Sequence, residues 1–198
     1  VSIDWARRYD LGAYTILVPV EDKIYILPRF FMPEKNALRK EQSDGTPYSS
    51  YARQGLITLT PGDTISHEAL VESLEEDRKN FKIDEIRFDP RFLFESSRLL
   101  DDMGFDAVEV AQHYTTLAPA TAYMEKLIME QRLIHNDHSL FNRCLQNTTL
   151  RINPQTEAAI PDKKKSRGRI DGVSACVTGL TYFVADEMSD WTGDLQLF

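Results

Sequence analysis

The chain has 198 residues, a mass of 22.7 kDa, 42% hydrophobic residues and a formal net charge of −8. This length suits one domain with a single large core. No apolar run approaches the roughly 18 residues of a membrane-spanning helix, and the N-terminus lacks the basic and then apolar layout of a signal peptide. We therefore expect no membrane contact and a location in a cytoplasm.

Charge is distributed unevenly along the chain. The pI near 5.0 is unfavourable for binding nucleic acid, which requires clustered Lys and Arg. Residues 151–169 nevertheless contain six basic and two acidic residues, whereas the last thirteen residues contain four acidic residues and no basic one. These patterns predict a basic segment inside a domain that spans residues 1–186, followed by an acidic C-terminal tail over residues 187–198.

The first third of the chain predicts an antiparallel meander of three strands. Apolar residues cluster in residues 1–4, 13–18 and 23–31, with short polar turns between them. Residues 33–55 are charged and rich in turn formers, which predicts a helix followed by a loop. Three side chains of this segment either line a groove or cover the sheet, and we favour the second: Tyr48, Tyr51 and Arg53.

Strands and helices alternate in the rest of the chain, which predicts parallel crossovers. We expect a short strand near residues 56–60, a helix capped by Ser66 and a strand ending at Asp89. A helix ending near Gly104, a strand over 106–111 and a helix over 118–135 with Pro119 in its first turn should follow. The chain should end with a helix over 139–146, a basic hairpin or loop over 149–169 and a final helix over 171–188. This order predicts an α/β fold of the RNase H-like type, with a mixed sheet of about five strands and helices on both faces.

Three carboxylates stand where an apolar segment is interrupted or ends. Asp4, Asp89 and Asp171 lie in SIDWA, IRFDP and RIDGVSACV. In the predicted fold they converge, and their mutual repulsion requires cations, for which hard divalent ions with oxygen ligands are suited. Two Mg²⁺ or Mn²⁺ ions roughly 3.5–4 Å apart would support hydrolysis of a phosphodiester. Alternatively, each residue alone is a helix cap or a turn residue.

Several longer segments resemble a known family, the nuclease domain of the large terminase subunit of tailed bacteriophages. The resemblance covers about residues 1–185. The segments that carry it are SIDWARRYDLGAYTIL, IRFDPRF, YMEKLIMEQRLIHNDHSLFNRCLQNTTLRI and RGRIDGVSACVTGL.

The resemblance implies an RNase H-like endonuclease that uses two divalent metal ions to cut concatemeric viral DNA during packaging. Asp4, Asp89 and Asp171 match the metal-binding triad of the family. Asp10 matches a further acidic position, and it either binds or positions a metal or water or forms a turn. Implied partners are double-stranded DNA, the terminase ATPase domain, the small subunit and the portal, in the cytoplasm of an infected or lysogenic bacterial host.

The chain departs from the family pattern in two ways, which limit the functions and metal ligands that the resemblance implies. The chain begins with Val and contains no GxxxxGK[ST] run, so we expect it to be part of a longer protein whose ATPase domain lies elsewhere. Some relatives have an acidic residue directly before the last catalytic position, where this chain has Ile170. Alternatives are a non-catalytic assembly module that binds DNA or the portal, and an actin-like ATPase half, which lacks support because Gly-rich phosphate turns are missing.

The basic segment before Asp171 is the best candidate for DNA contact. Backbone phosphates would have to approach the metals beside it, and one of the lysines would also stabilise the charged transition state. The predicted DNA-binding residues are Lys163, Lys164, Lys165, Arg167 and Arg169.

Other polar and aromatic candidates are weaker. His135 and His138 have a spacing that can bind a metal, but HNDH is better explained as a turn between helices. Trp5 is better explained as a core residue than as a stacking platform for bases. Cys144 and Cys176 lack CxxC spacing and provide neither a zinc site nor a disulfide framework.

Overall fold

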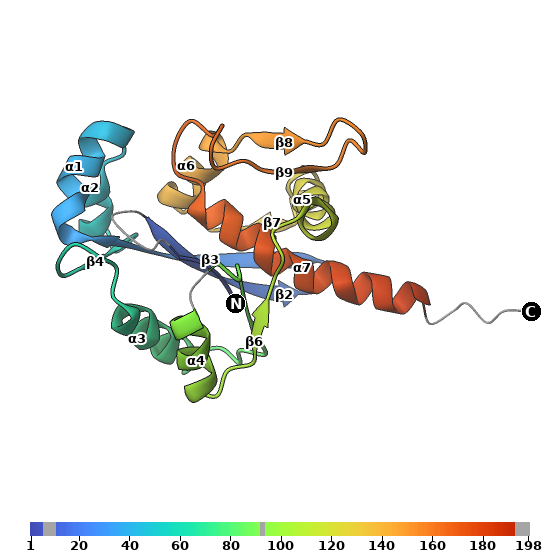
Figure 1. The fold of residues 1–198 in the computed structure, drawn as a ribbon, viewed down its shortest axis with the longest axis horizontal. Coiled ribbons are helices and arrows are strands. Elements are labelled where there is room, and N and C mark those ends of the chain that lie inside the picture. Colours follow the sequence, from blue (N-terminus) through green and yellow to red (C-terminus); the bar gives the residue numbers. More distant parts are fainter. Residues whose placement is uncertain (6–10, 92–93, 193–198) are drawn as a thin grey trace, which may run out of the picture.

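A mixed sheet with helices on both faces forms the centre of the molecule (Figure 1). The computed structural model describes residues 1–5, 11–91 and 94–192, and within these ranges the sheet has seven strands. They are β1 (Ser2–Asp4), β2 (Gly12–Val20), β3 (Lys23–Pro33), β4 (Thr58–Thr60), β5 (Ile86–Phe88), β6 (Ala107–Glu109) and β7 (Leu133–Ile134). A separate antiparallel hairpin contains β8 (Leu150–Ile152) and β9 (Ala159–Pro161).

The strand order confirms the predicted arrangement of meander and crossovers. β1, β2 and β3 pair antiparallel, and the order across the sheet is β4-β3-β2-β1-β5-β6. β1 and β5 are parallel neighbours, as are β5 and β6. The first strand therefore lies beside a strand that begins more than eighty residues later in the chain.

The predicted sheet of about five strands is too small. β4 and β7 both pair parallel with β3, near its opposite ends. β7 has two residues and β4 has three, and such short strands contain too few alternations for a period of two to identify them. Only pairing with the long strand β3 makes them part of the sheet.

Seven helices are present in the described residues. They are α1 (Glu34–Asp44), α2 (Tyr48–Arg53), α3 (His67–Asp77), α4 (Phe94–Asp102), α5 (Tyr114–Met129), α6 (Ser139–Asn147) and α7 (Asp171–Thr192). Ser66 caps α3, because its side chain accepts a hydrogen bond from the backbone of Ala69. No helix formed by the described part of the chain is long and apolar enough to cross a membrane.

Helix boundaries differ from the prediction at both ends of α5 and at the end of α7. α5 begins at Tyr114 and ends at Met129, so Pro119 lies inside the helix and not in its first turn, and residues 133–134, predicted as helical, form β7. Leu117 and Ala120 are buried, and this packing extends the helix through a residue that cannot donate a backbone hydrogen bond. α7 continues to Thr192, into the segment predicted as an acidic tail, whereas residues 193–198 lie outside the described residues.

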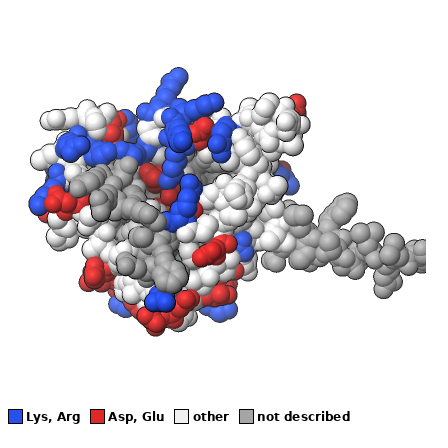
Figure 2. Space-filling view, viewed as in Figure 1, with Lys and Arg blue, Asp and Glu red and all other residues white. Residues whose placement is uncertain are grey.

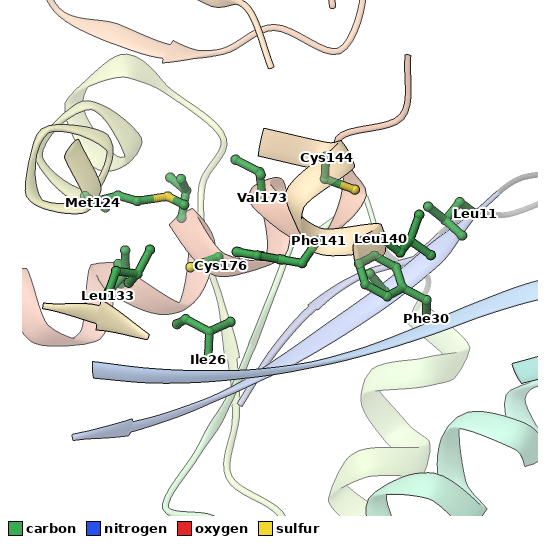
Figure 3. Close-up of a cluster of buried hydrophobic side chains, with 14 of the residues drawn as sticks. Leu11, Ile26, Phe30, Met124, Leu133, Leu140, Phe141, Cys144, Val173 and Cys176 are labelled. Atoms are coloured by element: carbon green, nitrogen blue, oxygen red, sulfur yellow. The ribbon is translucent and has the colours of Figure 1, made fainter. Parts of the chain in front are cut away.

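Each face of the sheet has its own hydrophobic core. On one face, strand residues such as Phe30 and Ile26 pack against α5, α6 and α7 (Figure 3). On the other face, Tyr14 and Phe31 contact residues of α3 and α4. Neighbouring residues Phe30 and Phe31 point to opposite cores, as the two-residue period of a strand requires. Tyr48 is fully buried in the first core, which agrees with a role in covering the sheet.

Helix α7 lies close against β1. Ser2 donates a hydrogen bond of 2.7 Å to the backbone carbonyl of Ala175. A Cβ atom on Gly179 would lie 2.5 Å from Ser2 Oγ, so only glycine permits this approach without a shift. The contact fixes the helix above the centre of the sheet, and it brings the first residue of α7 near the end of β1.

Candidate metal centre

The register of two parallel strands, β1 and β5, sets the relative positions of Asp4 and Asp89. Ser2 pairs with Arg87 and Ile3 with Phe88, so continuing the register by one residue places Asp4 beside Asp89. Residues two apart in a strand share a face, and both Ser2 and Arg87 contact α7, through Ala175 and Thr181. The side chains of Asp4 and Asp89 therefore project from the face of the sheet that α7 covers.

Asp171 is the first residue of α7 and is 8% exposed. A carboxylate is favourable in the first turn of a helix because the unpaired N–H groups there carry partial positive charge. Ile170, directly before it, is buried in the protein. The start of a helix therefore accommodates the Asp171 carboxylate, and the predicted catalytic role of this residue stays a prediction.

The ammonium group of Lys163 lies between Asp4 and Asp171. Its Nζ atom is 2.5 Å from Asp4 Oδ2 and 3.0 Å from Asp171 Oδ1. Lys163 donates a hydrogen bond to Asp171 and forms an ion pair with the buried Oδ2 atom of Asp4. Burial lowers the pKa of Lys163, but the charges of the two carboxylates outweigh this effect and raise the pKa above its ordinary value.

Asp89 is held by Arg91, two residues later. The Nη2 atom of Arg91 lies 2.7 Å from Asp89 Oδ2, and its Nε atom lies 3.1 Å from each carboxylate oxygen. The hydrogen bonds to Asp89 raise the pKa of Arg91. Arg91 is 78% exposed and Asp89 is 20% exposed, so the guanidinium covers the carboxylate from the solvent side.

Asp4 and Asp89 line the same cavity, of about 300 Å³. Its wall contains both acidic and basic side chains, among them Asp162, Lys163, Lys164, Arg91 and Arg151. Arg151 belongs to β8 and lies over the ring of Tyr114 in α5, 5.1 Å from its centroid. The hairpin and α5 therefore form one side of the cavity, and the ends of β1 and β5 form the other.

A capped turn holds the basic segment next to this cavity. Asp162 Oδ1 accepts hydrogen bonds from the backbone N–H groups of Lys164, at 2.9 Å, and Lys165, at 3.3 Å. The hydroxyl of Ser166 donates to the carbonyl of Asp162 and accepts from the backbone of Thr149. This segment is an ordered connection from β9 to α7, and Lys163 lies at its beginning.

Asn147 fixes the residues directly before Asp171. Its side chain donates to the carbonyl of Arg169, at 3.1 Å, and its own carbonyl accepts from the backbone of Arg167, at 3.3 Å. A Cβ atom on Gly168 would lie 2.6 Å from Asn147 Nδ2, so this position requires glycine. The last residue of α6 thereby sets the path by which the chain enters α7.

The five predicted DNA-binding residues are in different surroundings. Lys164 and Lys165 are exposed, as is Arg167, whereas Lys163 pairs with the two carboxylates. Arg169 pairs with Asp44 of α1, at 3.3 Å. Burial opposes the ionisation of Asp44, but hydrogen bonding by Ser43 and the charge of Arg169 hold its pKa below the ordinary value.

Surface charge is segregated between two sides of the molecule. Figure 2 shows Lys and Arg side chains gathered in the upper middle and upper left, where the connection from β9 to α7 and helices α1 and α2 lie in Figure 1. Acidic side chains gather in the lower part, where α3 lies. The basic surface therefore adjoins the carboxylates, although the chain as a whole is acidic.

The remaining candidates have structural roles or lie outside the described residues. Asp10 is outside them. His138 caps α6 by accepting from the backbone of Phe141, and burial lowers its pKa. The His135 ring packs against Phe141, with centroids 5.3 Å apart. Trp5 is buried against Phe31, at 5.2 Å, as expected for a core residue.

The sequence analysis did not identify two side chains of the centre, Arg91 and Gln112. A local signal could have identified Arg91, because it follows Asp89 by two residues, within reach of a turn after a strand. Gln112 also lines the cavity, and its side chain donates to the carbonyl of Val110. No local pattern marks Gln112, since only the folding of the chain after β6 brings it to the carboxylates.

The arrangement fits cations, although the described residues include no group of three or more His, Cys, Asp or Glu side chains placed to hold a metal ion. Asp4 and Asp171 already share one positive group, and both carboxylates are nearly buried. Carboxylate oxygens are the ligands that Mg²⁺ and Mn²⁺ prefer. Oxygen donors of this kind suit a hard divalent ion.

The strand order, and a covering helix that begins beside the ends of two parallel strands, place the chain in the RNase H-like fold class, as predicted. Residues 1–187 match the family described as terminase large subunit, endonuclease domain. The chain therefore belongs to this family.

A curated relative and a solved structure support the assignment. The large terminase subunit of Enterobacteria phage HK97 is 27% identical over 200 residues, which cover 100% of this chain and 39% of that protein. The crystal structure of the HK97 bacteriophage large terminase aligns with a TM-score of 0.85 and 26% identity, over 91% of this chain and 38% of that chain. The chain thus spans about two-fifths of the length of these relatives.

Proposed function

We propose that the chain is a divalent-metal-dependent DNA endonuclease in which Asp4, Asp89 and Asp171 bind Mg²⁺ or Mn²⁺. The observation that carries the proposal is the sharing of one cationic group by Asp4 and Asp171, with Asp89 in the neighbouring strand position. Two bound ions would activate a water molecule and stabilise the leaving oxygen of a phosphodiester. Asp10, in the opening motif, is proposed as a further ligand.

The residues around the carboxylates have separate tasks in this proposal. Lys164, Lys165 and Arg167 are exposed beside the cavity and bind backbone phosphates, which positions the duplex without reading its sequence. Asn147 and Asp44 hold the connection before Asp171, the second through Arg169. Lys163 also supplies positive charge close to the reacting phosphate.

The biological setting follows from the family. We propose that the substrate is concatemeric viral double-stranded DNA, cut during genome packaging in the cytoplasm of an infected or lysogenic bacterial host. The partners would be a terminase ATPase domain, a small terminase subunit and a portal. These proposals rest on membership of the terminase family and on the match to the HK97 large subunit.

Cleavage of supercoiled plasmid tests the activity. We expect the 198-residue chain to nick and linearise plasmid with Mg²⁺ or Mn²⁺, to be inactive in EDTA, and to recover when metal is added in excess. Agarose gels of a time course measure the result. Cleavage that is unaffected by EDTA would contradict the proposed metal centre.

A non-catalytic assembly module is the second candidate. The observation that favours it is that all three carboxylates already have a positive partner: Asp4 and Asp171 share Lys163, and Asp89 pairs with Arg91. Such a module would bind DNA in a gel-shift assay and leave plasmid intact with either metal. Retained binding without cleavage would therefore favour this candidate over the nuclease.

We expect the connection from β9 to α7, here called the basic connection, to determine the salt dependence of DNA binding. Changing Lys164, Lys165 and Arg167 together to Gln should weaken binding and lower the slope of log K against log salt concentration, by about 0.9 for each phosphate that is no longer neutralised. Fluorescence anisotropy with a labelled duplex at several salt concentrations measures the slope. Changing Lys79 and Lys82, on the α3 side of the sheet, is the control, and equal slopes in both variants would exclude the basic connection as the DNA-binding surface.

A further inference from the structure

The ammonium group of Lys163 lies where a divalent ion bound by Asp4 and Asp171 would have to lie. Its Nζ atom is 2.5 Å from Asp4 Oδ2 and 3.0 Å from Asp171 Oδ1. A divalent ion bound by the same two oxygens would need this space, and it would repel the ammonium group at such short range. The lysine and the metal ion therefore compete for one position.

We propose that Lys163 is a built-in counter-ion, which offsets part of the negative charge of Asp4 and Asp171 while no metal is bound and is displaced when a divalent ion enters. The inference rests on the proposed function, because it requires these carboxylates to bind the metal. It adds a competing residue, which lowers metal affinity and couples metal binding to movement of this side chain.

The burial of the three side chains makes such an exchange feasible. The side chains of Asp4 and Asp171 are 15% and 12% exposed, whereas that of Lys163 is 50% exposed. Two nearly buried carboxylates side by side are costly without a positive partner. The lysine reaches them from the surface, so its ammonium group can return to water by rotation of the side chain, without unfolding.

The backbone beneath Lys163 is held while the side chain moves. Asp162 Oδ1 caps the turn through the N–H groups of Lys164 and Lys165, and Ser166 links the turn to Thr149. The displaced ammonium group stays on the wall of the cavity that Asp4 and Asp89 line. There it is placed to meet a phosphate group of bound DNA, so one side chain serves the centre before and after the metal enters.

Direct metal binding tests the competition. The 198-residue chain, Lys163→Met and Lys165→Met are titrated with Mn²⁺, and free Mn²⁺ is followed by electron paramagnetic resonance, with no DNA present. We expect Lys163→Met to bind Mn²⁺ about tenfold more tightly, within the range usual for coupled charges of one network. Lys165→Met removes the same charge from the same turn, where only its backbone contacts Asp162, and it should match the unmodified chain.

Thermal unfolding provides a second readout that is independent of activity. In EDTA, Lys163→Met should unfold at a lower temperature than Lys165→Met, because two carboxylates lose their positive partner. Saturating Mn²⁺ should remove this difference, since ligand binding to the native state stabilises it. If Lys163→Met still unfolded at a lower temperature than Lys165→Met in saturating Mn²⁺, Lys163 would be only a packing residue and the inference would be overturned.

The outcomes separate this inference from the proposed function. Equal or weaker Mn²⁺ affinity in Lys163→Met, with clear binding by the unmodified chain that Asp4→Asn abolishes, would overturn the counter-ion role and leave the metal centre standing. If neither the unmodified chain nor Lys163→Met binds Mn²⁺, the metal centre itself is wrong.

Discussion

Changing Asp171 to Asn should abolish plasmid cleavage while the protein remains folded. Asp171 shares the cation position with Asp4, and Asn retains the shape of the side chain but not its charge. Loss of groups that only support metal ligands typically costs 10- to 100-fold, so loss of a proposed ligand should reduce the cleavage rate by more than about 100-fold. Initial rates from plasmid gels in Mg²⁺ measure the effect.

Two further variants make this result interpretable. Loss of one charge in the first turn of a helix costs only about 0.3–1 kcal/mol, so circular dichroism of Asp171→Asn should show unchanged helix content. Asp63→Asn removes an exposed carboxylate that pairs with Lys35 at 3.2 Å, and it should cleave at the normal rate. If Asp171→Asn retained a rate within about tenfold of normal, the carboxylate would not be a metal ligand of the kind proposed.

The largest effect on stability is expected at Asp77, the last residue of α3. Asp77 is 5% exposed, accepts a hydrogen bond of 2.6 Å from the hydroxyl of Tyr14, and pairs with Arg29 at 2.8 Å. Asp77→Ala should lower the free energy of unfolding by about 2–4 kcal/mol, because the hydrogen bonds from the Tyr14 hydroxyl and from Arg29 to a buried carboxylate are removed together. Urea denaturation followed by circular dichroism measures the decrease.

A double-mutant cycle with Tyr14→Phe isolates the hydrogen bond. The Tyr14 hydroxyl also contacts Ser73 Oγ at 2.6 Å, so Tyr14→Phe alone should cost less than Asp77→Ala, and the two decreases in stability should not add. Simple additivity would mean that the two side chains do not interact. Arg29 is 39% exposed and can turn to water, which keeps the decrease below that of a fully buried pair.

The same pair predicts a dependence of stability on alkaline pH. Burial and the hydrogen bond to Asp77 raise the pKa of Tyr14 above its ordinary value near 10. A raised pKa in the folded state stabilises the protein fully below the ordinary pKa, and this contribution is lost as pH rises above it. Tyr14→Phe should therefore lose less stability than the unmodified chain between neutral and strongly alkaline pH.

Most elements could be predicted from local pattern. β1, β2 and β3 have apolar residues at strand spacing and short turns between them, and β5, α4 and β6 follow the order of a parallel crossover. The short strands β4 and β7 could not be predicted with their partner, since two or three residues carry no periodicity of their own. The predicted start of α5 was wrong, because burial of the neighbours of Pro119 outweighed the preference of proline for the first turn of a helix.

The sequence by itself determined that Asp4, Asp89 and Asp171 are unusual, because a carboxylate in or beside an apolar segment needs a compensating partner. It also determined that a basic segment precedes Asp171. Only the tertiary structure decided which positive groups meet carboxylates distant in the chain: Lys163 lies between Asp4 and Asp171, and Arg169 pairs with Asp44. Charge pairing between distant residues depends on strand register, on the approach of α7 to β1 and on the capped turn after β9. None of these leaves a local pattern in the chain.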